Sequence, residues 1–187
     1  MAENNDIRDR TYLAILDGAS KAFMEKGDLA SMADVAHAAG VGRATLYRYF
    51  LTREELVTRL HQVAFDELAI ELDNLSLSLL SLEEALARFG RSVLGVSLRH
   101  SCVLHDFGSE QARELARAVV SPKLIKLIED RQRRGEIDPN LSSNVVAGYF
   151  GGMLATSSKM HALGILGIEE AASQSARIFA RGVSVKN

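Results

Sequence analysis

The chain has 187 residues, 47% hydrophobic and 25% charged, which is enough for a sizeable core and excludes both a disordered chain and a large multidomain enzyme. Its 22 Lys and Arg against 24 Asp and Glu give a formal charge of -2, so no overall positive field would draw it to nucleic acid or acidic lipid. A single cysteine, Cys102, excludes an intrachain disulfide, and no signal peptide or membrane span is visible. We therefore expect a soluble, cytoplasmic protein without a membrane partner.

The chain is predicted to be all-α, with about nine to ten helices. Apolar residues recur at three- and four-residue steps in nearly every segment, and Pro122 is the first of only two prolines. The first helix is expected over residues 9–26, ending at Gly27, and the residues before it would form a polar tail.

Helix starts are marked by three pairs of residues with the spacing of a capping box: Ser31 with Asp34, Thr52 with Glu55, and Ser81 with Glu84. The first pair predicts a short helix ending at Ala39, which Gly40 separates from another over residues 43–50. The second predicts a helix of ~22 residues, long enough to join two modules. Residues 75–82, where leucine alternates with serine, would connect it to the helix that the third pair starts.

The second half of the chain is predicted to hold five further elements. A short helix or turn is expected over residues 101–107, and helices are expected over residues 110–119, 121–134, 143–162 and 168–183. The division near residue 120 follows from Ser121 and Pro122, which have the order of an N-cap serine and a proline at the first helical position.

Residues 32–50 have the composition of a helix-turn-helix. Ala36 allows the two helices to cross closely, Gly40 supplies a positive φ, and Leu46 would fill the space between them. The outer face of the second helix then carries residue types that contact DNA: Arg43, Ala44, Thr45, Tyr47, Arg48 and Tyr49. Residues 41–53 hold three arginines and no acid, so their charge is +3 and that of the remaining chain is -5. The alternative is an ordinary helical hairpin without a DNA-binding role.

Several runs of residues combine into a more specific pattern: 15–23 (ILDGASKAF), 26–27 (KG), 35–36 (VA), 39–41 (AGV), 44–50 (ATLYRYF) and 52–56 (TREEL). This combination resembles the DNA-binding domain of the TetR family of one-component transcriptional regulators, and residues 134–139 resemble a join in the family's second domain. The resemblance implies a three-helix helix-turn-helix domain over residues 1–52. A long helix would join it to a helical ligand-binding and dimerisation domain over residues 53–187.

The resemblance also implies which residues contact DNA. Arg43, Ala44 and Thr45 would face base edges, and Arg53 would hold a phosphate at the start of the fourth helix. Met32 replaces a commoner threonine, and Leu51 replaces a frequent proline. The expected DNA-binding residues are Ser31, Met32, Arg43, Ala44, Thr45, Tyr47, Arg48, Tyr49 and Arg53. Two more arginines near the start of the chain, Arg8 and Arg10, would be either solvated or part of an arm over the minor groove.

A homodimer on a double-stranded, pseudo-palindromic operator is expected, because one such domain contacts too few base pairs for specificity. Small side chains on the last two helices would allow close approach of a second copy. The expected interface residues are Gly148, Gly151, Gly152, Ala155, Ala172, Ala176 and Phe179. The alternative is tight packing of these two helices within one chain.

A pocket for an unknown small-molecule effector is expected in the second domain. Its expected lining residues, each of which is also a common core type, are Phe65, Leu68, Phe89, Val93, Leu104, Phe107, Tyr149, Phe150 and Met153. The polar candidates for orienting a ligand are His61, His100, Cys102, His105 and His161.

Catalysis, cofactors and metals are not expected. Neither a Gly-rich phosphate loop nor a hydrolase or metalloprotease motif occurs, and the spacing of Cys102 from His100, His105 and Asp106 places these side chains on different helix faces. The sequence therefore predicts a DNA-binding transcriptional regulator, a repressor released from its operator by a small apolar molecule. The alternative is an all-α module that binds apolar ligands without specific DNA recognition, and a weaker third is an enzyme that uses Cys102.

Overall fold

The computed structural model describes residues 2–100 and 110–184, and side chains from residue 10 onward. Within them lie eight α-helices and one 3-10 helix: α1 (Ala2–Lys26), η1 (Gly27–Leu29), α2 (Met32–Ala38), α3 (Arg43–Tyr49), α4 (Arg53–Asp73), α5 (Leu82–Arg99), α7 (Glu110–Arg133), α8 (Ser143–Ala162) and α9 (Ile168–Val183). The predicted all-α fold is confirmed. The element expected over residues 101–107, with Cys102, Leu104, His105, Asp106 and Phe107, lies outside the described residues.

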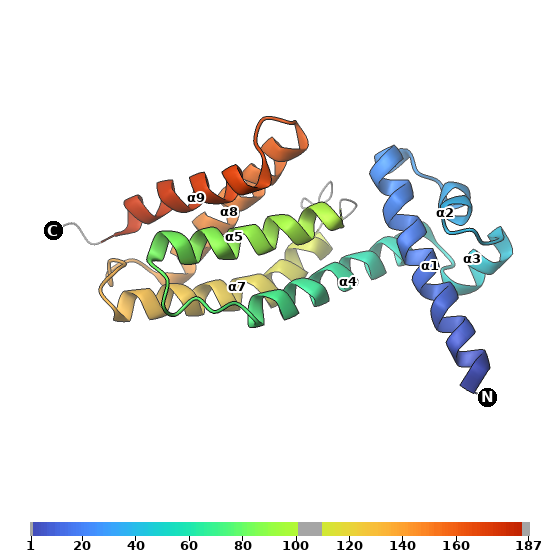
Figure 1. Cartoon of the computed structure of the whole chain (residues 1–187), viewed down its shortest axis with the longest axis horizontal. Coiled ribbons are helices and arrows are strands. Elements are labelled where there is room, and N and C mark those ends of the chain that lie inside the picture. The colour runs from blue at the N-terminus through green and yellow to red at the C-terminus, as the bar shows by residue number, and fades with distance from the viewer. Residues whose placement is uncertain (1, 101–109, 185–187) are drawn as a thin grey trace.

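The molecule is elongated, with two groups of helices joined end to end by α4 (Figure 1). At one end α1, α2 and α3 pack together, and at the other α5, α7, α8 and α9 form a bundle. Of the helices in the described ranges, none is both long and apolar enough to cross a membrane.

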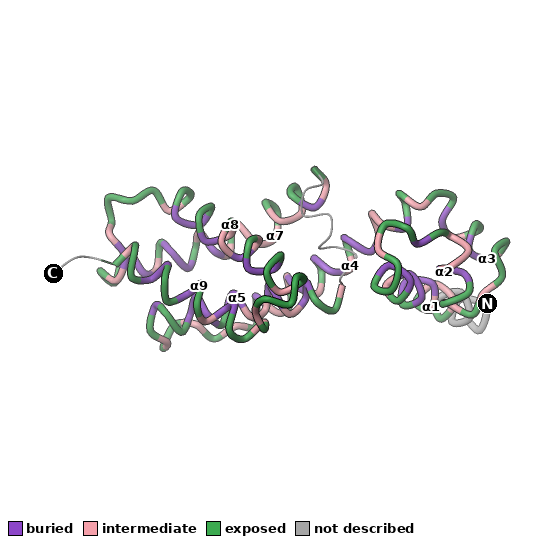
Figure 2. The backbone as a smooth tube through the Cα atoms, turned by 90° about the horizontal axis from the view of Figure 1, so that it is seen from above, coloured by how far each residue is buried: buried purple, intermediate pink, exposed green. Residues whose placement is uncertain are grey.

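The buried side chains fall into two separate clusters, and α4 contributes to both (Figure 2). Leu56 and Leu60 from its first turns complete the N-terminal core. Phe65, Leu68 and Leu72 from its later turns enter the core of the bundle. Both cores hold side chains of one continuous helix. A displacement of α4 in one core would therefore also displace its residues in the other.

Two of the three predicted capping boxes form completely. The Ser31 hydroxyl accepts from the Asp34 backbone N–H at 3.2 Å, and the Asp34 carboxylate accepts from the Ser31 N–H at 2.9 Å. Ser81 and Glu84 make the same pair of bonds at the start of α5.

The predicted third capping box differs in one bond. Thr52 Oγ1 accepts from the Glu55 N–H at 3.1 Å, as expected, but the Glu55 carboxylate accepts from the Leu51 N–H at 2.8 Å. Glu55 therefore caps one residue further back, and it ties the α3–α4 turn to the first turn of α4.

The first helix is longer than predicted. It begins at Ala2, so the expected polar tail is helical, as are Arg8 and Arg10. No proline or glycine occurs among residues 2–17, so no residue of this stretch interrupts the backbone hydrogen bonds of a helix.

The predicted break near residue 120 is also wrong, because α7 continues through Pro122. A proline inside a helix costs about 3 kcal/mol. That cost is offset by packing on both sides of it, since Val119 before the proline and Leu124 and Ile128 after it enter the same core. The Ser121 hydroxyl donates to the Ala116 carbonyl at 3.4 Å instead of capping a new helix.

Gly18 lets α1 pack directly on the end of α2. A Cβ atom at Gly18 would lie 2.6 Å from both the Cα and the Cβ of Ala39, a distance that side chains do not adopt. Ala39 is fixed in turn, because its N–H donates to the Val35 carbonyl at 2.9 Å. The helix-turn-helix is therefore held on α1 by a contact that requires glycine.

Arginines from α7 and the turn after it fix the connection between α4 and α5. Arg131, only 1% exposed, donates to the Leu80 carbonyl at 2.8 Å and the Leu77 carbonyl at 2.6 Å, and it pairs with Glu136 at 2.9 Å. Arg134 donates to the Ser78 carbonyl at 2.5 Å. The backbone of the serine-rich segment predicted as a connection is thus held by charged donors from outside the segment.

We predict that Gly18→Ala destabilises the protein by about 1–3 kcal/mol, because overpacking must push α1 away from the end of α2. Urea unfolding followed by circular dichroism would measure the loss. Gly95→Ala is the matched control, since a Cβ atom there meets only the flexible end of Arg99, at 3.5 Å. Equal stability of Gly18→Ala and the native chain would show that this contact is not required.

Candidate DNA-binding surface and ligand cavity

The helix α3 presents an exposed basic face. Arg43, Ala44, Tyr47 and Arg48 are exposed, whereas Leu46 beneath them is fully buried. Residues four apart lie on one side of a helix, so Arg43 with Tyr47 and Ala44 with Arg48 form one stripe. With no acid among residues 41–53, this stripe is a cationic surface within an acidic chain.

Thr45 and Tyr49 lie on the flank of that stripe and are half-buried. The Tyr49 ring lies 6.3 Å from the ring of Tyr12 on α1, and the Arg48 guanidinium lies 5.8 Å from the Tyr49 ring. Tyr12 also receives a hydrogen bond from Arg59 of α4. Tyr49 thus packs α3 against α1, and less of its surface is available for DNA than the sequence suggested.

The start of α2 is held by a charged network. The Ser31 hydroxyl donates to the Asp34 carboxylate at 2.6 Å, and Lys26 pairs with the same carboxylate at 2.5 Å. The bonds from Lys26 and Ser31 hold the pKa of Asp34 well below its usual range. Ser31 is exposed next to Met32, which is half-buried on the N-terminal core.

Arg53 is held at the start of α4 by contacts on two sides. Its guanidinium lies 4.8 Å from the centre of the Phe23 ring and 3.7 Å from the Asp28 carboxylate. Its Nε is buried without a hydrogen-bond partner among the described residues. The side chain is one-third exposed, so its charge is positioned by the fold and still reaches solvent.

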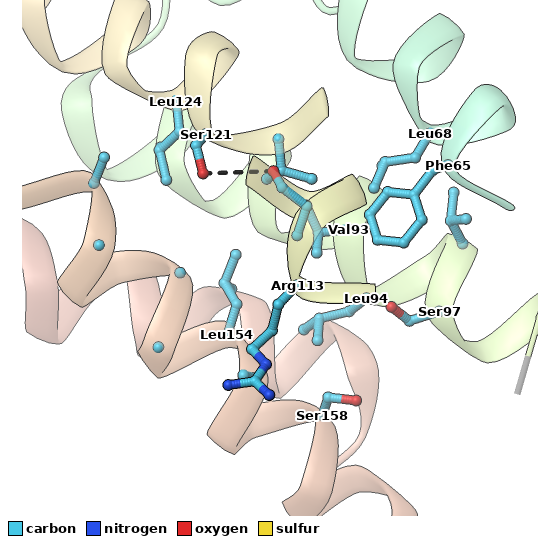
Figure 3. Close-up of a pocket in the computed structure, with 18 of the residues that line it drawn as sticks. Phe65, Leu68, Val93, Leu94, Ser97, Arg113, Ser121, Leu124, Leu154 and Ser158 are labelled. Atoms are coloured by element: carbon cyan, nitrogen blue, oxygen red, sulfur yellow. Dashed lines mark hydrogen bonds between the residues drawn. The ribbon is translucent and has the colours of Figure 1, made fainter. Parts of the chain in front are cut away.

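A cavity of about 280 Å³ lies in the bundle, between α4, α5, α7 and α8 (Figure 3). Most of its lining is apolar: Ala64, Phe65, Leu68, Val93, Leu94, Val96, Ala116, Val120, Leu124, Ala147, Leu154 and Ala155. Three glycines complete the α8 wall: Gly148, Gly151 and Gly152. Four polar residues also line it: Ser97, Arg113, Ser121 and Ser158.

Of the expected pocket residues that the structure describes, some line this cavity and the others lie in the core or on the surface. Phe65, Leu68 and Val93 line it. Phe89 and Phe150 are buried in the core instead. Of the remaining two described residues, Met153 packs against that core and Tyr149 is 73% exposed.

The expected interface residues also fall into two groups. Gly148, Gly151, Gly152 and Ala155 line the cavity, and no atom lies within 4 Å of a Cβ built on any of these glycines. Ala172, Ala176 and Phe179 are instead buried inside the chain.

These three residues of α9 pack against α5 and α8. A Cβ at Gly90 of α5 would lie 3.7 Å from the Cβ of Ala172, and the Phe179 ring lies 5.0 Å from that of Phe150 on α8. Burial removes Ala172, Ala176 and Phe179 from any surface that a partner can touch.

None of the described histidines lines the cavity. His61 is buried on α4, and His161 Nδ1 lies 2.9 Å from the Leu166 carbonyl. His100 Nε2 lies 2.6 Å from the Glu67 carboxylate. Burial raises the pKa of Glu67, but hydrogen bonds from His100 and Arg99 lower it below its ordinary value. Within residues 10–100 and 110–184, no cluster of three His, Cys, Asp or Glu residues could hold a metal ion.

Comparison with known proteins identifies the N-terminal domain. Residues 15–60 match the family model described as bacterial regulatory proteins of the tetR family. The N-terminal domain therefore belongs to the TetR family. The match spans the helix-turn-helix and the first turns of α4, which is the part of the chain that carries the exposed basic stripe.

Several solved structures share the whole fold, among them that of a TetR-family transcriptional regulator, PfmR. PfmR from Thermus thermophilus superposes with a TM-score of 0.70 at 21% identity, over 92% of this chain and 99% of PfmR. The fatty acid degradation regulator FadR from Bacillus halodurans gives 0.79 at 18% identity, over 92% and 95%. RolR in complex with its ligand resorcinol gives 0.67 at 21% identity, over 97% and 91%. The chain thus has the fold of DNA-binding transcriptional regulators.

We predict that Asp34 stabilises the protein at neutral pH and progressively less in acid. Its pKa is depressed in the folded chain, so its contribution is complete above the unfolded value, about 4, and is lost as the pH falls below that value. Thermal unfolding between pH 7 and pH 3 should show a gap in Tm between the native chain and Asp34→Asn that narrows in acid. Asp66→Asn, at an exposed acid on α4, is the control. A gap that stays constant with pH would contradict the prediction.

Proposed function

We propose that this TetR-family protein is a repressor that binds a pseudo-palindromic operator as a homodimer and leaves it when a small, largely apolar molecule fills the cavity. Residues 1–52, with the first turns of α4, would bind DNA, and residues 53–187 would bind the ligand and the partner. The observation that carries the proposal is that one helix, α4, packs into the DNA-binding domain and also lines the cavity. The complex of RolR with resorcinol is consistent with a small-molecule effector.

The exposed stripe of α3 would enter the major groove. Arg43 and Arg48 can each pair bidentately with guanine, and Ala44 can contact a thymine methyl group. The half-buried Thr45 and Tyr49, with Tyr47, would contact the backbone. A phosphate would approach Arg53 at the start of α4, and Ser31 and Met32 would lie along the neighbouring strand.

A dimer would use the outward sides of α8 and α9. Three large apolar side chains are exposed there: Tyr149 (73%), Ile178 (64%) and Val145 (54%). Exposed Gly148 and Gly152 lie along the same helix, where the missing side chains allow a partner helix to approach. Two DNA-binding domains would then contact half-sites ~34–36 Å apart.

Two features would transmit a displacement at the cavity to the DNA-binding domain. Within α4, Leu56 in the N-terminal core and Phe65 and Leu68 at the cavity are held by one helix, over roughly 18 Å at 1.5 Å per residue. In addition, the Thr58 hydroxyl on α4 bonds Gln111 at 3.1 Å, two residues before the cavity residue Arg113 on α7. A ligand that separates α7 from α4 would tilt α4 and favour dimers with a different spacing of the two α3 helices.

We predict that a palindromic duplex, obtained by selection from random DNA, binds the dimer with an affinity that falls steeply with salt. Arg43→Ala and Arg48→Ala should each weaken binding about ten- to a hundredfold, because a bidentate contact to a base contributes ~1–3 kcal/mol. Arg88→Ala, at an exposed arginine of α5, is the matched control. Fluorescence anisotropy across a salt series would measure both effects. Selection that yields no consensus would favour the alternative of a ligand-binding module without specific DNA recognition.

We predict that Tyr149→Asp and Ile178→Asp each convert the dimer to monomers, because a charge would be buried at the centre of the interface. Sedimentation velocity would measure the change. Leu79→Asp is the matched control, since Leu79 is 98% exposed on the α4–α5 connection and far from α8 along the chain. A dimer that survives both the α8 and the α9 substitution would place the interface elsewhere.

A further inference from the structure

The cavity is amphipathic, because four polar residues, Ser97, Arg113, Ser121 and Ser158, interrupt an otherwise apolar lining. Arg113 is the only charged residue that lines it within the described chain, and no acid does. In Figure 3 the Arg113 guanidinium reaches across from α7 toward α8, on the side where Ser97 and Ser158 also lie. Phe65, Leu68 and Leu124 lie toward the opposite side of the cavity.

Two hydroxyls at the polar side have unused hydrogen-bonding capacity. Ser97 is 6% exposed and Ser158 is 8% exposed, and neither hydroxyl makes a hydrogen bond to the rest of the described chain. Ser121, by contrast, already donates to the Ala116 carbonyl. A ligand oxygen would therefore gain hydrogen bonds from Ser97 and Ser158 specifically.

Arg113 supplies a positive charge beside these hydroxyls. It pairs with Glu110 at 3.2 Å, and its side chain is 53% exposed at the mouth of the cavity. A planar guanidinium has five N–H donors in a fork that matches a carboxylate, so an incoming carboxylate can share it with Glu110 or replace that contact. One cation and two hydroxyls suit a single negative charge better than a phosphate dianion.

The cavity volume limits the apolar part of the ligand. An apolar cavity of about 150 Å³ holds one benzene molecule. The 280 Å³ here is roughly twice that and therefore has room for about ten to twelve non-hydrogen atoms.

We propose that the effector of this protein is a monocarboxylate with an apolar body of this size, whose carboxylate binds Arg113, Ser97 and Ser158. This proposal names the chemical class of the ligand. That the ligand acts as an effector rests on the proposed repressor function. The apolar body would lie among Phe65, Leu68 and Leu124, where the hydroxyl of the neighbouring Ser121 already donates to the Ala116 carbonyl.

The test uses three probes that share one alkyl chain and differ in the head group: decanoate, 1-decanol and decylammonium. Isothermal titration calorimetry on the full chain without DNA should show decanoate binding at least tenfold more tightly than 1-decanol, and decylammonium more weakly than either. Arg113→Gln should reduce decanoate affinity to that of 1-decanol and leave 1-decanol unchanged. Ser97→Ala combined with Ser158→Ala should weaken decanoate about three- to tenfold.

Two controls locate the site. Arg117→Gln removes a cation one turn further along α7, which also pairs with Glu110, at 3.3 Å, but does not line the cavity, so decanoate affinity should not change. Gly151→Leu places a side chain in the cavity where no atom lies within 4 Å of its Cβ, so the chain should fold and decanoate binding should be lost.

Equal affinities for decanoate and 1-decanol, an unchanged ratio in Arg113→Gln, or no binding of decanoate would each overturn the proposal. Because the titration contains no DNA, its result is independent of the repressor hypothesis. If decanoate binds as predicted but never changes operator affinity, the carboxylate site stands and the proposed release mechanism fails.

Discussion

The packing of α4 into two separate cores is the constraint on which the rest of the structure depends. Leu56 and Leu60 are locked among the helices that present α3, and Phe65 and Leu68 form a wall of the cavity. Close-packed interiors resist small displacements, so we expect a ligand that pushes on Phe65 to move the helix rather than to compress the core behind it. The connection after α4 is held by Arg131 and Arg134, so we expect a displacement of α4 to move its N-terminal end together with the DNA-binding domain.

The two domains differ in their distribution of charge. The stripe on α3 is cationic although the chain carries a net charge of -2, because its positive charges lie within residues 41–53. Among the described residues that line the cavity, Arg113 at its mouth is the one cation, and most of the others are apolar. Local arrangement, not overall composition, is therefore the basis for proposing a polyanion as the partner of one domain and a small amphipathic molecule as the ligand of the other.

Signals that are local in the sequence predicted the fold well, and signals that depend on long-range packing did not. The capping pairs at Ser31 and Ser81 and the turn at Gly40 act within a few residues, so they could be recognised without the structure. The continuity of α7 through Pro122 could not, because it is decided by core contacts on both sides. Likewise, the requirement for glycine at Gly18 appears only once Ala39 is known to lie against it.

The cavity and the proposed dimer surface also depend on long-range packing, so the sequence alone could not place them. Small residues on α8 indicate the close approach of another helix or of a ligand. Only the fold shows that Gly148 and Gly151 line a cavity and that Ala172 is already buried against α5.

The central claim is that the cavity controls the spacing of the DNA-binding domains through α4. It is tested most directly by pulsed electron paramagnetic resonance. A spin label on the cysteine of Ala38→Cys, in a Cys102→Ser background, would report the distance between the two DNA-binding domains of the dimer. A ligand that fills the cavity should deplete the population suited to half-sites ~34–36 Å apart. An unchanged distance distribution, together with a fall in operator affinity, would contradict the account.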